Sequence, residues 1–468
     1  MRHHALLAME AQHPELWQAE VSGMHLWPLV RNYLMVTISS QQRDHTVSYA
    51  VKKRDFLLPK AWPGYARTLA FLAAPRPRAR FPVLLVKHAN TLYVDEQTGV
   101  ICDRLYEPYY AVAGDPLILE EGQPVYPRHY RRSKAQQHVY SADALLLLSY
   151  ISAMAQRLPG PARREITDFA AFIADLFDTR DLHDFWVRRM TTFVKMYRSM
   201  RPLLARHIAP KMRRRLALVH GASYMGIRAV YTKALREAGW KIIAEVQHGL
   251  LDEFAYHLPE MDTHDCASIC RDYMPDVLLT FGDYWSRKAR TPARCVSIGN
   301  AYLNRVVHDL GRHTPNPRQI LIISQGTVTQ RLVELAHHLS AAFPDHTIVF
   351  KLHPREVTFQ DRYQSLHQLP NVTVETFANV YALIAHSPII VGYNSTALFE
   401  ALAFGHKRLF VLENADIPPD LGAHFATAGE LTDLIRDCRS GYSTSTPETY
   451  WAPDAESRIR AFFDETMT

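Results

Sequence analysis

The chain has 468 residues, of which 47% are hydrophobic and 21% are charged, and its formal net charge is +6. This composition is typical of globular proteins, and the length is too great for one core, so we expect two domains with accessory helices. Basic residues cluster at 76–80, 128–134 and 211–215. These clusters suggest contact with an anionic membrane surface or substrate, or simply a solvated surface. No nucleic-acid-binding motif accompanies them, so no nucleic-acid partner is expected.

The chain lacks the patterns of disulfide, metal and membrane-spanning proteins. Its five cysteines are scattered and odd in number, which argues against a disulfide framework. None of the 24 histidines forms an HExxH pattern, and no second cysteine pair completes a zinc site with Cys266 and Cys270. There is neither an apolar signal segment nor a long apolar run. We therefore expect a reduced cytoplasmic protein without a metal or cofactor, one that would contact the inner membrane only peripherally.

The first part of the chain is read as an accessory segment followed by a mixed region. Residues 1–80 are expected to be irregular, with a short helix around Trp27, for which a structural role is the default and a docking role the alternative. The first buried strand is predicted at 81–86. Loops with short strands follow to 127, including an aromatic run at 106–110 that suits either sugar stacking or a core. Helices are predicted at 142–157 and within 167–208.

From residue 214 onward, short apolar strands alternate with helices, which predicts parallel sheets. The strands of the first series are expected at 216–219, 241–246, 276–281 and 294–298. After a linker at 299–318, a second series is expected at 320–323, 347–350, 372–374, 389–391 and 408–412. The fold class is therefore α/β with two Rossmann-like domains, at 81–300 with a helical insertion and at 314–440, and with extra helices in the N-terminal segment. The tail at 441–468 is expected to pack back on the N-terminal domain.

Two polar motifs follow strands of the second series, where α/β sheets bind ligands. Lys351 and His353 lie two residues apart and so share a face, which lets both reach one anion, and Pro354 constrains the turn. A surface lysine and a buried histidine are the alternatives. Further candidates for contacts to a nucleotide are Ser324, Gln325, Gly326, Asn394, Ser395, Thr396 and Glu400.

Each of these further candidates has a structural alternative. Ser395 and Thr396 offer hydroxyls and backbone N–H groups to a phosphate, but equally suit a helix N-cap. Glu400 lies one helical turn after Thr396, where it can accept from a ribose hydroxyl or remain an exposed helix carboxylate. The loop at 324–327 lets its backbone approach a base or phosphate, or serves as a simple turn.

The first series has its own candidate for proton transfer. His248 follows a buried strand and precedes Gly249, where it can act as a general base on a hydroxyl or position a leaving group. The loop from His220 to Ser223 follows another strand, and packing is its preferred interpretation, with contact to an acceptor as the alternative. The candidates for a carboxylate base or nucleophile are Glu245, Asp252, Glu253 and Asp95, and spacing does not choose among them.

These motifs resemble those of known transferases. Residues 350–354 (FKLHP) resemble the "HP" motif of bacterial transferases that use cytidine-nucleotide donors, and Tyr393-Asn394-Ser395-Thr396 resembles their Ser-Ser or Ser-Thr motif. Gln247-His248-Gly249 is similar to a His-Gly element of several such families. The resemblance covers about residues 214–412 and implies a GT-B glycosyltransferase with two domains facing a cleft. No Asp-x-Asp motif stands near a strand end, which suggests metal-independent transfer.

The resemblance also implies a function. It points to an enzyme of bacterial capsule or lipopolysaccharide O-antigen synthesis that transfers an acidic sugar, Kdo-like first and sialic-acid-like second, from a CMP-sugar to a glycan or lipid-linked glycan acceptor. The alternatives are a CDP-glycerol- or CDP-ribitol-type phosphotransferase, a UDP-sugar-dependent GT-B transferase, a nucleotide-sugar 2-epimerase and a non-catalytic scaffold.

Overall fold

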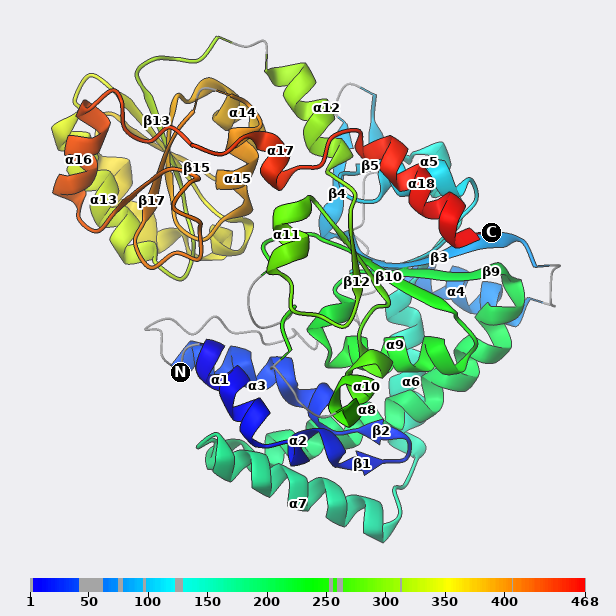
Figure 1. Ribbon diagram of the computed structural model, residues 1–468. Helices are drawn as coiled ribbons and strands as arrows, with labels where there is room; N and C mark the ends of the chain where they lie inside the picture. Colours follow the sequence, from blue (N-terminus) through cyan, green and yellow to red (C-terminus); the bar gives the residue numbers. More distant parts are fainter. Residues whose placement is uncertain are drawn as a thin grey trace. The chain divides into compact units, whose positions relative to one another are not determined.

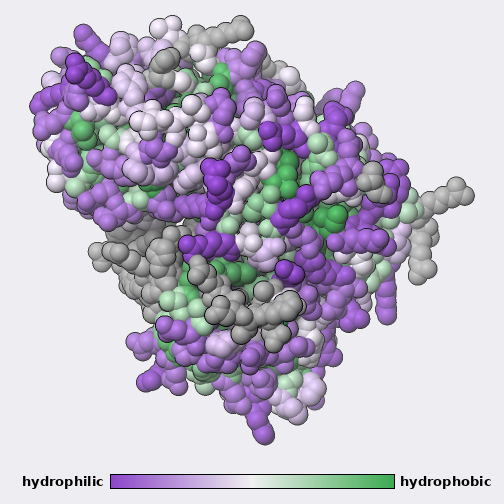
Figure 2. Space-filling view, viewed as in Figure 1, coloured by the Kyte–Doolittle hydropathy of each residue, from purple (hydrophilic) through white to green (hydrophobic). Residues whose placement is uncertain are grey.

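The computed structural model describes residues 3–41, 62–74, 79–95, 98–122, 129–251, 256–258, 264–311, 314–405 and 407–467 (Figure 1). The chain divides into two compact units. Unit 1 comprises Met1–Phe281, Trp285–Ile298 and Asp454–Thr468, and unit 2 comprises Gly282–Tyr284 and Gly299–Pro453. Within the described ranges, none of the helices combines the length and the apolar run needed to cross a membrane. Hydrophilic residues cover most of the face seen in Figure 2.

Unit 1 is built on a seven-stranded sheet with the strand order β12-β11-β10-β9-β3-β6-β8. Every pairing in this sheet is parallel. The strands are β3 (Phe81–His88), β6 (Leu117–Glu121), β8 (Val139–Ser141), β9 (Met212–Val219), β10 (Ile242–Val246), β11 (Val277–Thr280) and β12 (Arg294–Ser297). The order reverses between β3 and β9, which is the topological switch point of a doubly wound sheet.

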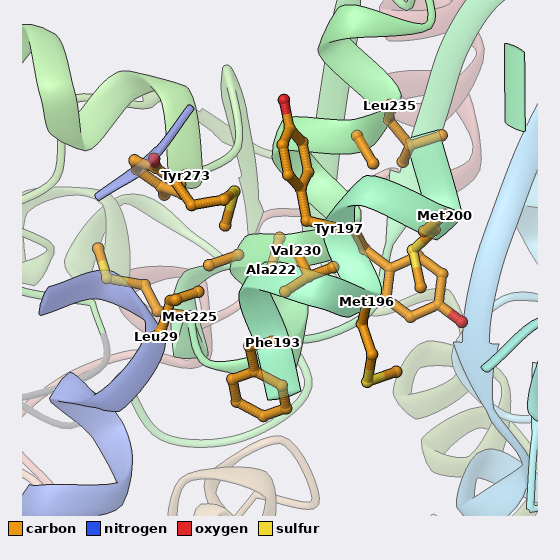
Figure 3. Close-up of a cluster of buried hydrophobic side chains, with 14 of the residues drawn as sticks. Leu29, Phe193, Met196, Tyr197, Met200, Ala222, Met225, Val230, Leu235 and Tyr273 are labelled. Atoms are coloured by element: carbon orange, nitrogen blue, oxygen red, sulfur yellow. The ribbon is translucent and has the colours of Figure 1, made fainter. Parts of the chain in front are cut away.

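The apolar run of β3 is explained by burial on both faces of this sheet. Leu84 and Val86 join the larger core cluster of unit 1, whereas Val83 and Leu85 join a second cluster. A strand buried on both faces needs apolar residues at every position, so its sequence is continuously apolar and does not alternate between apolar and polar residues. Figure 3 shows part of the larger cluster, where Phe193 and Tyr197 lie among side chains from several helices.

Helices cover this sheet, and two small sheets complete unit 1. The helices are α1 (His3–Gln12), α2 (Glu15–Gln18), α3 (Trp27–Gln41), α4 (Trp62–Ala73), α5 (Glu107–Ala113), α6 (Ala142–Ala155), α7 (Gly160–Leu176), α8 (His183–Leu203), α9 (Ile227–Glu237), α10 (His264–Tyr273) and α18 (Ala455–Met467). The small sheets pair β1 (Glu20–Val21) with β2 (Met24–His25), and β5 (Val100–Asp103) with β4 (Leu92–Asp95) and β7 (Arg131–Arg132). Helix α11 (Asp283–Lys288) spans the division between the units.

The N-terminal segment is more regular than its sequence indicates, since its described part contains α1 to α4. Trp27 is fully buried, stacks on Phe177 and donates from Nε1 to Glu10 at 2.6 Å. Arg31, also buried, pairs with Glu10 through Nε at 2.6 Å. The short helix expected around Trp27 is present as α3, which extends to Gln41, but the expectation of irregular structure was wrong for α1, α2 and α4.

Unit 2 contains a six-stranded sheet with the order β15-β14-β13-β16-β17-β18, again with every pairing parallel. Its strands are β13 (Gln319–Ile323), β14 (Thr347–Lys351), β15 (Val372–Glu375), β16 (Ile389–Gly392), β17 (Arg408–Leu412) and β18 (Ala423–Phe425). The order reverses between β13 and β16. The predicted fold class, α/β with two Rossmann-like sheets and extra N-terminal helices, is confirmed.

The helices of unit 2 include one that the sequence did not predict. Its helices are α12 (Ala301–Leu310), α13 (Thr329–Ala342), the 3-10 helix η9 (Pro354–Gln368), α14 (Val380–His386), α15 (Thr396–Leu402), α16 (Ala428–Arg436) and α17 (Pro447–Tyr450). Helix α12 occupies much of the expected linker, and the Asn300 side chain caps it by accepting from the Leu303 backbone at 3.0 Å. The Gly, Asn, His and Pro content of the segment concealed this capped, amphipathic helix.

Candidate functional site

Two histidines meet at the switch point of unit 1. His220 follows β9, and its backbone N–H donates to the Val86 carbonyl of β3 at 2.8 Å, so it lies where the strand order reverses. His248 follows β10, the neighbour of β9. Their ring centroids are 4.2 Å apart. Carboxyl ends of adjacent parallel strands meet at one edge of a sheet, and this explains why residues from separate loops converge.

Glu245 lies at this edge as a fully buried carboxylate on β10. It accepts from the Ser223 backbone N–H at 2.7 Å and from the Ser223 hydroxyl at 2.6 Å, both in the loop after β9. The Tyr256 hydroxyl donates to its other oxygen at 3.1 Å. Burial disfavours the charged form and raises the pKa of Glu245 to about 7, although these hydrogen bonds act in the opposite direction.

Glu245 and Tyr256 face one nitrogen of His248. Nδ1 of His248 lies 3.9 Å from Oε1 of Glu245 and 3.5 Å from the Tyr256 hydroxyl. The carboxylate is therefore placed to stabilise a positive charge on the imidazole. A histidine with a carboxylate behind it is the arrangement used for general-base catalysis on a hydroxyl.

His220 is the more buried of the two histidines and is oriented by Tyr106, whose hydroxyl lies 3.1 Å from its Nδ1. Burial, followed by the nearby charges of His248 and Arg228, holds the pKa of His220 well below its ordinary value. His220 is therefore neutral at pH 7, and a neutral imidazole can accept a proton or a hydrogen bond. The sequence favoured packing as the role of the loop that begins at His220, with contact to an acceptor as the alternative.

Further charged residues near the switch point form ion pairs with one another. Arg228, at the start of α9, binds Glu121 of β6 through two hydrogen bonds of 2.5 and 2.7 Å. Lys87 of β3 contacts Asp103 at 2.5 Å and Glu120 at 2.9 Å, and all three side chains are fully buried. These pairs bind neighbouring segments to one another, which indicates a structural role.

The other three predicted carboxylates differ in what the structure describes of them. Asp252 and Glu253 lie outside the described residues. Asp95 ends β4 in the separate three-stranded sheet, where Oδ1 accepts from the Thr98 backbone at 3.4 Å. Of the two predicted carboxylates that the structure describes, Glu245 is the one placed beside His248, and Asp95 is not. The sequence spacing does not identify Tyr256 as a site residue, because its hydrogen bond to Glu245 forms only in the folded chain.

In unit 2, the predicted nucleotide-binding residues follow three neighbouring strands, β14, β13 and β16. Lys351 ends β14 and is largely buried, with Nζ donating to the Thr376 carbonyl at 2.7 Å and to the Leu352 carbonyl at 3.1 Å. Burial lowers the pKa of Lys351. The lysine ammonium is therefore directed toward the loop that follows β15. His353 lies in the short loop after β14, immediately before η9 begins at Pro354.

Sequence reasoning missed Glu356, a buried carboxylate that organises this edge of unit 2. It accepts from the backbone N–H of His353 at 3.0 Å, and from the hydroxyl of Ser324 at 3.1 Å. The hydroxyls of Thr329 and Tyr363 donate to it at 3.1 and 2.5 Å. The Ser324 hydroxyl thus serves the packing of its own loop, and a Cβ on the adjacent Gly326 would contact Glu356 at 3.5 Å. The sequence feature that could have identified Glu356 is its position three residues after His353.

The remaining predicted residues lie on the loop after β16 and on α15. Ser395 caps α15, its hydroxyl accepting from the Ala397 backbone at 3.3 Å. Asn394 accepts through Oδ1 from the Asp416 backbone at 2.6 Å, and this bond holds the loop after β17. Glu400 accepts from the Tyr381 hydroxyl at 3.1 Å. The loop at Gln325 turns through a backbone hydrogen bond of 2.9 Å from Val328. Within the described part of the chain, no cluster of His, Cys, Asp or Glu is suited to a metal ion.

No family model and no curated protein matches the sequence. Solved structures similar to this chain include the UDP-GlcNAc 2-epimerase of Methanocaldococcus jannaschii, with 10% identity, a TM-score of 0.46, and coverage of 82% of this chain and 99% of that one. The UDP-GlcNAc 2-epimerase of Neisseria meningitidis shows 12% identity, a TM-score of 0.44 and coverages of 82% and 100%. MurG of Acinetobacter baumannii shows 12% identity, a TM-score of 0.39 and coverages of 82% and 99%. Structural similarity at this level does not indicate a function.

Proposed function

We propose that this protein is a nucleotide-sugar-dependent glycosyltransferase, with the donor nucleotide bound by unit 2 and the acceptor hydroxyl activated by unit 1. The observation that carries the proposal is the buried Glu245 carboxylate beside His248 at the switch point of unit 1. Ligands of doubly wound sheets bind at such switch points, and a histidine backed by a carboxylate suits proton abstraction from a hydroxyl.

The proposed reaction divides the chemistry between the two units. His248 takes the proton of the acceptor hydroxyl, and Glu245 stabilises the imidazolium that results. The acceptor oxygen forms a bond to the anomeric carbon as the bond from that carbon to the nucleotide phosphate oxygen breaks. The electron pair leaves with the nucleotide, whose negative charge is stabilised by donors of unit 2.

In unit 2, we place the nucleotide at the switch point between β13 and β16. His353 follows the adjacent β14, and Glu356 holds the loop of His353 in place. Lys351 is the last residue of β14, but its side chain donates to the Thr376 and Leu352 carbonyls, so His353 is the proposed donor on this strand. The HP motif supports a CMP-linked acidic sugar, Kdo-like first, with a glycan of the bacterial surface as acceptor. No sequence or structural observation favours the phosphotransferase, epimerase or scaffold alternatives over this proposal, and membrane-surface contact stays a prediction.

A panel of CMP, CDP, UDP and GDP tests the donor half by thermal shift, because a ligand that binds only the folded state raises the melting temperature. We expect CMP to stabilise the protein, and His353→Ala to weaken this stabilisation. His367→Ala, which removes an exposed histidine of η9, the helix that follows the His353 loop, is the control. Stabilisation by UDP alone would overturn the CMP assignment, and no stabilisation by any nucleotide would overturn the donor site.

Replacement of His248 tests the acceptor half. Loss of a general base lowers kcat by about 100-fold or more, so we expect His248→Ala to show this loss while the Kd for CMP stays unchanged. His308→Ala, which removes an exposed histidine of α12, is the control. Turnover of the sugar nucleotide without an acceptor, or transfer that persists in His248→Ala, would contradict the assigned reaction.

A further inference from the structure

A depression of about 450 Å³ opens on unit 1 away from the residues assigned to transfer. Its lining is dominated by one helix and is rich in arginine: Ser22, Tyr197, Arg198, Arg201, Pro202, Ala205 and Arg206. Arg198 and Arg201 are three residues apart on α8 and so share a face. After Pro202 the chain continues as a π-helix (Leu204–Ile208), which carries Arg206.

The depression has a rigid floor and wall. Tyr197 is 3% exposed and belongs to the core cluster drawn in Figure 3. The wall is the tight turn between β1 and β2, in which Ser22 and Gly23 both have positive φ, of 54° and 83°. Such a two-residue hairpin turn has a defined shape. A Cβ on Gly23 would lie 3.6 Å from the Tyr197 hydroxyl, so the turn packs against the floor.

The charge of the lining is positive and only partly compensated. Glu237 lies 3.3 Å from Arg201, with the two side chains 32% and 57% exposed. Among the residues that the structure describes, neither Arg198 nor Arg206 has a carboxylate within ion-pair distance. Two guanidinium groups thus flank the depression without a counter-ion from the described part of the chain. Guanidinium forks match the oxygen geometry of phosphate and carboxylate groups through paired hydrogen bonds.

The position of the depression separates it from the proposed transfer site. The π-helix leads through Ala209–Lys211 into the amino end of β9 at Met212, whereas His220 follows the carboxyl end of the same strand. A strand of this length spans on the order of 20 Å, so one small ligand does not reach both places. The arginines are therefore unexplained by transfer chemistry.

We propose that this depression binds a phosphate ester through Arg198 and Arg206, with Arg201 beside them. The volume suits a phosphate with an organic group attached rather than the bare ion. A phospholipid headgroup and a free phosphorylated small molecule share this chemistry. The lipid source is of interest because α6, whose Ser152 bonds Ser199 of α8 at 3.0 Å, also carries the exposed apolar side chains of Ile151 and Met154.

The test compares two double variants of the full chain that remove equal charge. Arg198→Gln/Arg206→Gln alters the depression, and Arg213→Gln/Arg214→Gln removes two exposed arginines of β9 that do not line it. Binding of glycerol 3-phosphate is measured by calorimetry, and co-sedimentation is measured with phosphatidylcholine vesicles with and without phosphatidylglycerol. All these arginines are exposed, so thermal unfolding is expected to be unchanged.

We expect the first double variant to lose at least about tenfold in affinity, because it removes charge-assisted hydrogen bonds from both arginines to the phosphate. The control is expected to keep the wild-type affinity. Binding of phosphatidylglycerol vesicles but not of glycerol 3-phosphate identifies a lipid headgroup, and the reverse identifies a soluble ester. Binding of neither, or an equal loss in both double variants, would overturn the proposal. These measurements do not depend on transfer activity.

Discussion

At the scale of single residues, Glu245 combines complete burial with a titratable group. Its hydrogen bonds from Ser223 and Tyr256 favour the charged form, but the loss of hydration outweighs them and the pKa rises to about 7, from an ordinary value of 4.5. A carboxyl with a pKa near neutrality, placed beside His248, is the kind of pair that active sites contain. The same shift has a consequence for stability.

Glu245 is expected to make the protein less stable as the pH rises from about 4.5 to about 7. In this window the folded protein keeps a proton that the unfolded chain has released, so the free energy of unfolding falls as pH increases. The fall amounts to about 3 kcal/mol at most. Glu245→Gln stays neutral, so its stability relative to the wild type should increase across this window. Urea unfolding at pH 4.5 and pH 7.5 measures the difference.

Glu165→Gln serves as the control for this prediction, because Glu165 is exposed on α7. It should follow the wild-type pH dependence. If the curves of Glu245→Gln and the wild type run parallel from pH 4.5 to pH 7.5, the carboxyl of Glu245 does not titrate as described. Reduced kcat in Glu245→Gln, with the donor affinity retained, would further tie the residue to His248 rather than to folding alone.

At the scale of elements, Glu356 connects three segments of unit 2. It receives hydrogen bonds from the loop after β13, from the start of α13 and from η9, as well as from the backbone of His353. The ends of β13 and β14 are thereby held to one carboxylate. The loop that carries His353 has its shape because of this buried acceptor.

Glu356→Ala is therefore expected to destabilise unit 2 by at least about 3 kcal/mol, since it leaves several buried donors without an acceptor. It should also weaken the stabilisation of the protein by CMP, because the His353 loop loses its support. Chemical unfolding and the nucleotide panel measure the two effects. Glu334→Ala, an exposed glutamate of α13, should change neither. Full CMP binding in folded Glu356→Ala would show that the loop keeps its shape without this carboxylate.

At the scale of the whole molecule, the chain returns to unit 1 after completing unit 2. Residues Asp454–Thr468 belong to unit 1, and α18 contributes Ile459, Phe462 and Phe463 to the core cluster on the face that also includes Tyr109 of α5. The ring centroids of Phe463 and Tyr109 are 6.4 Å apart. One face of the sheet of unit 1 thus depends on the last helix of the chain.

Truncation after Pro453 is expected to destabilise unit 1 while unit 2, which ends there, keeps its fold. Hydrogen exchange should accelerate in β3 and α5 but not in β13 to β17. Phe463→Ala is a milder test and should cost about 3–5 kcal/mol, the usual loss for a buried phenylalanine. Arg460→Ala, an exposed position of the same helix, is the control. Unchanged exchange in β3 after truncation would show that α18 is dispensable.

Local patterns in the sequence predicted the fold class but not every strand, since β6 lies in a region expected to hold loops with short strands and no strand was expected at β8 or β18. Apolar runs alternating with helices predicted two parallel sheets, because burial on both faces of a strand and on one face of a helix leaves distinct periods. They also placed Lys351, His353 and His248 at strand ends. They failed for α1, α2 and α4 of the N-terminal segment, and for α12, where turn-forming residues concealed the helical period.

The composition of the site depended on contacts between residues far apart in the chain. Tyr106 meets His220 across 114 positions, and Ser324 meets Glu356 across 32. No short-range period encodes such pairs, since they arise only when strands pair in a given order. The sequence therefore determined which strand ends are polar, whereas the tertiary structure decided that Glu245, rather than Asp95, stands beside His248, because β10 adjoins β9 in the main sheet and β4 belongs to another.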